Sequence, residues 1–184
     1  MREPEPETIR RAQAGDLRAF ESLVRGAQTD AWRFAYHLTG DRALAEDVTQ
    51  EAFLRAYRAL DTFHGEAKFS SWLLRIVRNC AVDAYRKTKR ENVVSTDPAD
   101  MAGRSGRPEQ TGGGGAEDRL RIADAIRRLP IELREPFVAI EILGFTYQET
   151  SAILRVKIGT LKSRMYRARL LLMHALSEEA AGEM

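Results

Sequence analysis

The fold of this chain is decided by the stretch TYQETSAILRVKIGTLKSRMYRARLLL, residues 146–172. Thr146 and Glu149 form a T-x-x-E capping box, which predicts that a helix begins there and runs to residue 154. The next four residues, RVKI, are a short turn, and a second helix is predicted over 159–179. Two helices joined by so short a turn are typical of a helix-turn-helix, whose second helix enters the major groove of DNA.

The second of these helices is predicted to be amphipathic. At 100° per residue its core stripe consists of Leu161, Met165, Ala168 and Leu172. The opposite side carries Lys162, Ser163, Tyr166 and Arg167, and the stripe is flanked by Arg164 and Arg169. The alternative interpretation is a basic helix that faces only water. The cations begin in the first helical turn, where the helix dipole opposes positive charge, and this favours DNA binding.

The net charge of +2 hides an uneven distribution. Residues 67–90 hold seven Lys or Arg against one Asp, and residues 155–176 hold six against no acid, whereas the rest of the chain is neutral or acidic. Two separate basic segments predict two contacts with a polyanion.

The sequence predicts an all-α protein of two small helical domains joined by a flexible linker. Helices are expected over 6–15, 17–40, 42–60, from Ser70 or Ser71 into 86–90, 119–129 and 130–144, with Asp16 and Asp41 as N-caps. Residues 91–118 hold six of the thirteen Gly and two of the six Pro, which is typical of a linker, here with a span of roughly 30 Å. The expected domains are 1–90 and 119–178, followed by an acidic tail, 179–184.

Several classes of function are disfavoured. No apolar run approaches the roughly 20 residues that span a bilayer, so no membrane contact is expected, and the single Cys80 fits a cytoplasmic location. The sequence shows no paired carboxylates, phosphate loop or metal-spaced His and Cys, and its three His are scattered. We therefore expect no catalytic residue, no metal and no cofactor, and not an enzyme.

Two features of the first domain remain open on the residues alone. Leu54 lies on an otherwise polar helix face with Asp47, Gln50, Glu51 and Arg58, and it is either an ordinary exposed leucine or an anchor for a basic partner helix. A second feature is the predicted loop 61–69 with the start of the next helix, where aromatic and basic side chains meet: Phe63, His64, Lys68, Phe69 and Trp72. This loop is either a small core cluster or a pocket for unstacked bases.

The segments QAGDLRAFESLV (13–24), AEDVTQEAFLRAYRALDTFHGEAKFSSWLLRIVRNCAVDAYRK (45–87) and IRRLPIELREPFVAIEILGFTYQETSAILRVKIGTLKSRMYRARLLL (126–172) together resemble bacterial extracytoplasmic-function sigma factors of RNA polymerase. The combination of the three motifs D-x-x-Q-E-x-F-L, R-N-x-x-x-D and G-T-x-K-S-R is specific for this family. The resemblance implies an alternative sigma factor that binds core polymerase through the β′ clamp and β flap and opens promoter DNA. It also implies an anti-sigma factor as a further partner, as in many members.

The resemblance assigns a role to each surface. The residues implied to bind core polymerase are Asp47, Gln50, Glu51, Leu54 and Arg58. Those implied to recognise and melt the −10 element are Phe63, His64, Lys68, Phe69, Trp72, Arg75, Asn79 and Arg86. Those implied to read the −35 element are Arg155, Lys157, Thr160, Lys162, Ser163, Arg164, Tyr166 and Arg167.

The turn of the helix-turn-helix departs from the family pattern. Arg155 and Lys157 stand where the family often has Gly and then Pro, and a non-Gly residue at positive φ costs on the order of 1 kcal/mol. We therefore expect either a slightly different turn or a phosphate contact by Arg155. The alternative function is a free-standing helix-turn-helix regulator, which would bind duplex DNA without polymerase and would not melt it.

Overall fold

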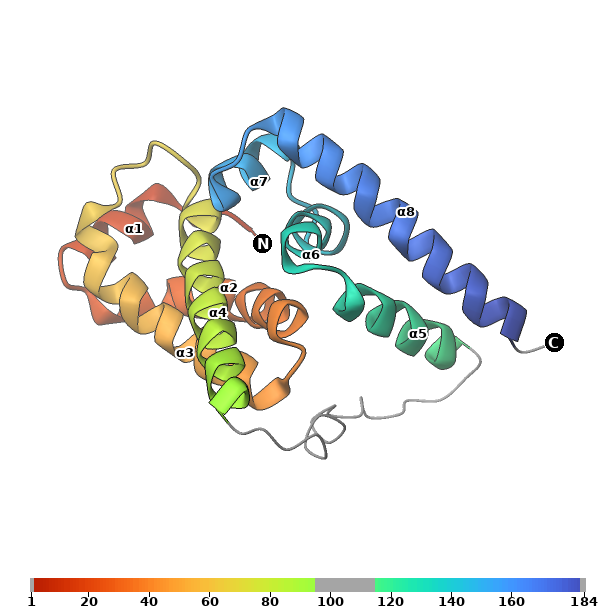
Figure 1. The fold of residues 1–184 in the computed structure, drawn as a ribbon. Helices are drawn as coiled ribbons and strands as arrows, with labels where there is room; N and C mark the ends of the chain where they lie inside the picture. Colours follow the sequence, from red (N-terminus) through yellow and green to blue (C-terminus); the bar gives the residue numbers. More distant parts are fainter. Residues whose placement is uncertain (1, 95–114, 183–184) are drawn as a thin grey trace.

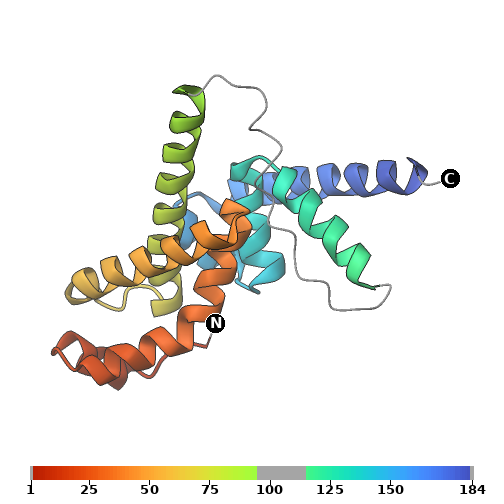
Figure 2. The ribbon, with the colours of Figure 1, turned by 90° about the horizontal axis from the view of Figure 1, so that it is seen from below.

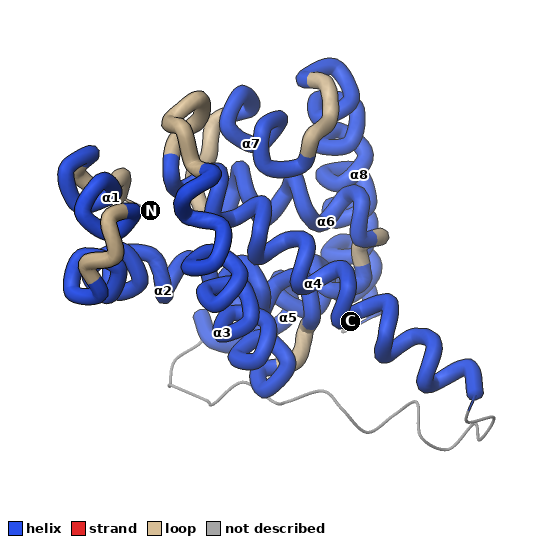
Figure 3. The backbone as a smooth tube through the Cα atoms, turned by 90° about the vertical axis from the view of Figure 1, so that its left-hand side faces the viewer, coloured by secondary structure: helices blue, strands red, loops and turns tan. Residues whose placement is uncertain are grey.

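The computed structural model describes residues 2–94 and 115–182, and within these residues every regular element is helical (Figure 3). The elements are α1 (Pro6–Gln13), α2 (Leu17–Thr39), α3 (Arg42–Ala59), a 3₁₀ turn η1 (Leu60–Thr62), α4 (Phe69–Val94), α5 (Gly115–Arg128), α6 (Ile131–Phe137), a π-helical turn η3 (Val138–Ile142), α7 (Tyr147–Leu154) and α8 (Ile158–Gly182). The predicted all-α class, with a helix-turn-helix formed by α7 and α8, is confirmed.

The predicted N-caps are also confirmed. Asp16 accepts hydrogen bonds from Arg18 N at 3.0 Å and Ala19 N at 3.2 Å, and Asp41 accepts one from Leu44 N at 2.8 Å. Helix α2 ends at Gly40, whose φ of 73° is the left-handed conformation that glycine adopts without a Cβ clash. Short polar side chains and one glycine therefore set the bends between α1, α2 and α3.

The two helices on either side of the predicted linker extend beyond their predicted limits. Helix α4 begins at Phe69 and continues to Val94, and α5 begins at Gly115, so both ends of the predicted linker 91–118 are helical. Its remainder, 95–114, lies outside the described residues. Of the predicted tail 179–184, the backbone of 179–182 continues α8, and 183–184 lie outside the described residues.

Helix α6 changes its hydrogen-bonding pattern after Pro136. Proline has no N–H to donate, and the following turn η3 has the wider π pattern, with Leu143 N donating to Val138 O at 3.0 Å. The turn ends at Gly144, with φ of 74°, and Phe145 then leads into the capped start of α7.

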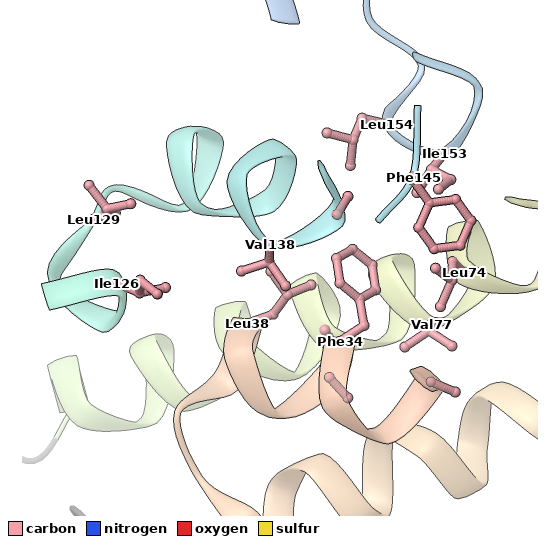
Figure 4. Close-up of a cluster of buried hydrophobic side chains, with 14 of the residues drawn as sticks. Phe34, Leu38, Leu74, Val77, Ile126, Leu129, Val138, Phe145, Ile153 and Leu154 are labelled. Carbon is pink, nitrogen blue, oxygen red and sulfur yellow. The ribbon is translucent and has the colours of Figure 1, made fainter. Parts of the chain in front are cut away.

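The two halves of the chain share one hydrophobic core. Figure 1 shows α2 and α4 facing α6 and α7, while Figure 2 shows α5 and α8 projecting on the side away from α1 and α3. In the core, the fully buried Phe34 and Leu38 of α2 lie with Leu74 and Val77 of α4 (Figure 4). From the second half the cluster receives Ile126, Leu129, Val138, Phe145, Ile153 and Leu154. Burying these side chains stabilises the two halves against each other as well as internally.

Polar contacts also join the halves. Arg78 of α4 and Glu135 of α6 form a two-pronged ion pair, with Nε–Oε1 at 2.8 Å and Nη2–Oε2 at 3.2 Å, although Glu135 is only 2% exposed. Arg134 donates to Leu38 O at 3.0 Å and Leu129 O at 2.8 Å, so one guanidinium satisfies carbonyls near the ends of α2 and α5.

Among the described residues, no helix combines the length and apolarity needed to cross a membrane.

Candidate nucleic-acid interface

The exposed side of α8 carries the predicted −35-reading residues. Leu161, Met165 and Ala168 are completely buried, which fixes the rotation of the helix and turns the opposite side outward. There Tyr166 is 64% exposed, Lys162, Ser163 and Arg167 are also exposed, and Arg164 is half-buried. Within the described residues, the structure records no carboxylate partner for Lys162, Arg164 or Arg167. These charges are therefore available for an external anion.

The turn before α8 is held by side-chain contacts. The capping box is present: Glu149 N donates to Thr146 Oγ1 at 3.2 Å, and Thr146 N donates to Glu149 Oε2 at 2.8 Å. Ser151 Oγ donates to Val156 O at 2.6 Å across the turn. Arg155 adopts φ of 56° and ψ of 42°, so the backbone keeps the left-handed conformation at this position although the residue is not glycine. The exposed Arg155, Lys157 and Thr160 lie at the N-terminal end of α8, and they extend its basic side into the turn.

The candidate −10 loop joins η1 to α4. His64 and Lys68 are exposed and Phe63 is half-buried, whereas Phe69 and Trp72 are buried. The three rings contact one another, with Phe63 5.7 Å from Phe69 and 5.4 Å from Trp72 between centroids. Phe69 and Trp72 thus support the loop from beneath, and Phe63, His64 and Lys68 form its outer side.

Further along α4, the predicted DNA-facing stripe is present on the helix surface. Asn79 and Arg86 are exposed and Arg75 is half-buried, at a spacing that places all three on one side of the helix. Of the basic segment 67–90, Arg75 and Arg86 therefore lie on this side of α4 and Lys68 on the loop before it, whereas Arg78 pairs with Glu135.

The loop touches the second half of the molecule. Lys68 Nζ donates to Glu149 Oε1 at 2.5 Å, and this hydrogen bond, with the capping contacts from Thr146, lowers the pKa of Glu149 to about 2. The same contact raises the pKa of Lys68. A cavity of about 300 Å³ lies beside it, lined by Glu3, Lys68, Ser70, Phe145, Thr146 and Glu149 among others. The candidate −10 loop is thus in contact with the helix-turn-helix.

The polar face of α3 has an apolar centre. Leu54 is 53% exposed, and Asp47, Gln50 and Arg58 are exposed around it. Glu51 is half-buried and accepts a hydrogen bond from Arg55 Nε at 2.6 Å. The structure therefore places the five predicted residues on one side of α3.

The periodicity of α3 also predicts that Tyr57 is buried, and this is wrong. Tyr57 is 45% exposed, and only an edge contact to Phe20, 4.9 Å between centroids, covers its ring. It lies one helical turn after Leu54 and enlarges the exposed apolar area. A helical wheel places Tyr57 at the margin of the core stripe, where periodicity alone does not separate buried from exposed.

The remaining reactive groups form no cluster. Cys80 is buried, and burial raises the pKa of its thiol. Within residues 2–94 and 115–182, no three His, Cys, Asp or Glu side chains gather in a way that could hold a metal ion.

Comparisons with known proteins match both halves. Residues 23–91 match the family model of sigma-70 region 2, and residues 119–172 match that of sigma-70 region 4. The sigma factor SigC of Mycobacterium tuberculosis is 32% identical over 163 residues, which cover 86% of this chain and 83% of the relative. SigW of Bacillus subtilis is 29% identical over 169 residues, which cover 88% of this chain and 90% of SigW.

Solved structures agree with the sequence matches. The sigma factor RpoE of Bartonella quintana, solved with the anti-sigma factor NepR, superposes with a TM-score of 0.73 at 28% identity and covers 86% of this chain and 96% of its own. CnrH, solved with the cytosolic domain of CnrY, gives a TM-score of 0.71 at 25% identity, and the match covers 93% of this chain and 96% of CnrH.

A chain whose described elements are helical and that matches sigma-70 region 2 and, after it, sigma-70 region 4 is a sigma factor, a class of DNA-recognition subunits of RNA polymerase. Within that class, the chain belongs to the extracytoplasmic-function (ECF) family of alternative sigma factors.

Proposed function

We propose that this chain directs core RNA polymerase to promoters by reading a −35 element with α8 and a −10 element with the loop before α4, where it also opens the duplex. The observation that carries the proposal is the row formed by Lys162, Arg164 and Arg167 on α8, for which the described part of the chain provides no carboxylate partner, in a chain that matches sigma regions 2 and 4. Lys and Arg on such a helix bind phosphates and guanine edges in the major groove.

Opening of the −10 element is attributed to the outer side of the loop. A base stacked on an aromatic ring gains about 1–3 kcal/mol, which is comparable with the few kcal/mol that unpairing costs. Phe63 is the ring on the outer side of the loop, with His64 and Lys68 beside it. Because Phe69 and Trp72 are buried, we assign them the role of supporting the loop, and Arg75, Asn79 and Arg86 the role of holding the strand along α4.

Docking on polymerase is attributed to α3. A leucine ringed by polar groups is a typical anchor for a partner helix, and Leu54 with Asp47, Gln50, Glu51 and Arg58 has this composition. We add Tyr57 to this surface because it is exposed next to Leu54. The expected partner surface is the β′ clamp helix pair, with the β flap as the contact of the second half.

Use of both DNA-reading surfaces at once requires the two halves to separate. In the structure the −10 loop contacts α7 through Lys68 and Glu149. Two promoter elements lie more than one duplex turn apart, about 34–36 Å, and two halves held together by this contact are not expected to reach both. We infer that polymerase binds an opened form. The compact form fits an anti-sigma partner, since RpoE and CnrH were each solved with one.

The test is reconstituted transcription with core polymerase on a promoter library. Leu54→Ala should weaken core binding, measured by anisotropy of the labelled chain, and Leu17→Ala, at an exposed leucine at the start of α2, is its control. Arg167→Ala should lower transcription from promoters that need the −35 element and leave core binding intact, with exposed Arg25→Ala as control.

The outcomes separate the two candidate functions. A free-standing regulator predicts tight duplex binding without polymerase and no permanganate-reactive bases when core enzyme is added. If the wild-type chain behaves in that way, the sigma factor proposal is overturned.

A further inference from the structure

The N-terminal segment, residues 2–22, lies before the part of the chain that matches sigma region 2, which begins at residue 23. Helix α1 nevertheless packs beneath the loop that joins η1 to α4, as Figures 1 and 2 both show. Two side chains of this segment, Gln13 at the end of α1 and Glu3 before its start, hold the two ends of this loop. Its role therefore concerns the candidate −10 surface.

Gln13 holds the start of the loop. Its side-chain Nε2 donates to Leu60 O at 3.0 Å and to Phe63 O at 2.7 Å, so a single amide group bridges two carbonyls across the 3₁₀ turn η1. An amide nitrogen carries two hydrogens, and both are used here.

Glu3 holds the end of the loop. Its carboxylate accepts hydrogen bonds from Phe69 N and from Ser70 N, the latter at 3.3 Å, which are the first two N–H groups of α4. These N–H groups have no partner within the helix, and a carboxylate at this end is favoured by the helix dipole. Both ends of the loop are thus tied to the same short segment.

The segment itself is firmly placed. Ile9 and Ala12 are buried in the cluster that contains Leu60, Phe69 and Trp72. Arg11 donates to Asp16 Oδ2 through Nε at 3.0 Å, and the same aspartate caps α2. Gln13 therefore stands at the end of a packed helix, and Glu3 lies in the short stretch that leads into the same helix.

The loop has few bonds of its own between these anchors. Backbone hydrogen bonds at its ends run from Phe63 N to Leu60 O at 3.1 Å and from Trp72 N to Lys68 O at 3.0 Å, and residues 64–68 are exposed. A loop that orders only when DNA binds loses affinity through that ordering, whereas a loop held in place beforehand does not.

We propose that Glu3 and Gln13 are positioning residues for the −10-reading loop, fixing its conformation without touching DNA. This role rests on the proposed function. The proposed positioning role predicts that loss of either anchor weakens promoter opening and reduces discrimination among −10 sequences. Binding to core polymerase and to −35 duplex DNA should be unchanged.

The test uses the full-length chain with core polymerase. Gln13→Glu replaces a donor by an acceptor of the same shape facing two carbonyls, and Gln28→Glu, at an exposed glutamine of α2, is the matched control. Glu3→Ala removes the second anchor, with Glu5→Ala as control because Glu5 makes no side-chain capping bond. Gln13→Lys keeps an N–H donor of sufficient reach and should retain most activity.

Open-complex formation should fall about tenfold in Gln13→Glu and in Glu3→Ala, the effect of one lost anchor. The ratio of open-complex formation on the cognate −10 sequence to that on altered −10 sequences should fall as well. Amide hydrogen exchange of residues 63–70 in the free chain should speed up in the same variants. Unchanged thermal stability, core affinity and −35 affinity would separate positioning from general misfolding.

Two failures are distinguishable. If the wild-type chain opens promoters and Gln13→Glu and Glu3→Ala do so equally well and with equal −10 discrimination, the positioning role alone is overturned. If the wild-type chain does not open promoters with core polymerase, the proposed function falls, and the positioning role falls with it.

Discussion

Lys68 Nζ and Glu149 Oε1 lie 2.5 Å apart, although 81 positions separate them in the sequence. The lysine belongs to the candidate −10 loop and the glutamate to the capping box of α7, so one ion pair joins the two candidate DNA-reading halves. While Glu149 holds Lys68, that charge is not available to a phosphate.

Glu149→Gln should raise the affinity of the free chain for a labelled single strand carrying the −10 sequence. Glutamine at this position keeps the capping box but removes the charge facing Lys68. A partly exposed ion pair is worth up to about 1 kcal/mol, so the expected gain is at most about fivefold, measured by anisotropy at low salt. Glu141→Gln breaks a comparable pair with Arg169, at 2.6 Å, and should leave this affinity unchanged. Equal affinities in all three chains would contradict the prediction.

Arg78→Ala should destabilise the chain more than Glu135→Gln. The arginine substitution leaves a nearly fully buried carboxylate without its partner, which costs about 3–5 kcal/mol. The glutamine substitution leaves a guanidinium that is already 30% exposed and can turn to water. Urea titration measures the difference, and Arg55→Ala, at an exposed pair, should shift stability by less than about 1 kcal/mol. The reverse order would contradict the inference that the buried charge of Glu135 is the costlier one to leave without its partner.

Local signals in the sequence predicted local structure well. The capping box of Thr146, the caps at Asp16 and Asp41 and the exposed Leu54 each depend on a few neighbouring residues, and each is found in the structure. The rotation of α8 was predictable because its apolar stripe is narrow and continuous.

Contacts between distant segments were not predictable in the same way. Phe34 and Val138 lie in one core, but nothing near either residue in the sequence indicates this contact. From the sequence alone, Glu135 would be taken for an ordinary surface acid, because no neighbouring residue indicates its ion pair with Arg78. Glu3 and Gln13 likewise carry no pattern, since their partners are backbone groups more than 45 positions away.

Acidification should destabilise the chain through His37. Burial, with smaller effects from the nearby Arg33 and Arg134, lowers the pKa of His37 to about 4. Because this value lies below the unfolded value of 6.5, the unfolded chain binds more protons between pH 6.5 and 4, and the free energy of unfolding falls as pH falls through this range. The expected loss is about 2 kcal/mol between pH 7.5 and 5.

Urea titrations at pH 7.5, 6 and 5 test this dependence. His37→Gln should flatten it, and His64→Gln, at the exposed histidine, should not. The pKa of Glu149 is about 2, so its contribution is lost only as pH falls below about 4.5 and does not interfere at pH 5. A slope that persists in His37→Gln would assign the effect to another group.

Arg155→Gly should stabilise the chain while weakening its contact with DNA. Among the described residues, Arg155 is the one non-glycine residue at positive φ, and releasing its Cβ from this conformation is worth about 0.5–1 kcal/mol. Arg155→Ala keeps the Cβ and should give no such gain. Both substitutions remove the same exposed cation, so both should reduce the salt dependence of −35 duplex binding by about one phosphate contact. Stability that rises in both variants, or in neither, would show that the left-handed backbone at this turn is not the source of strain.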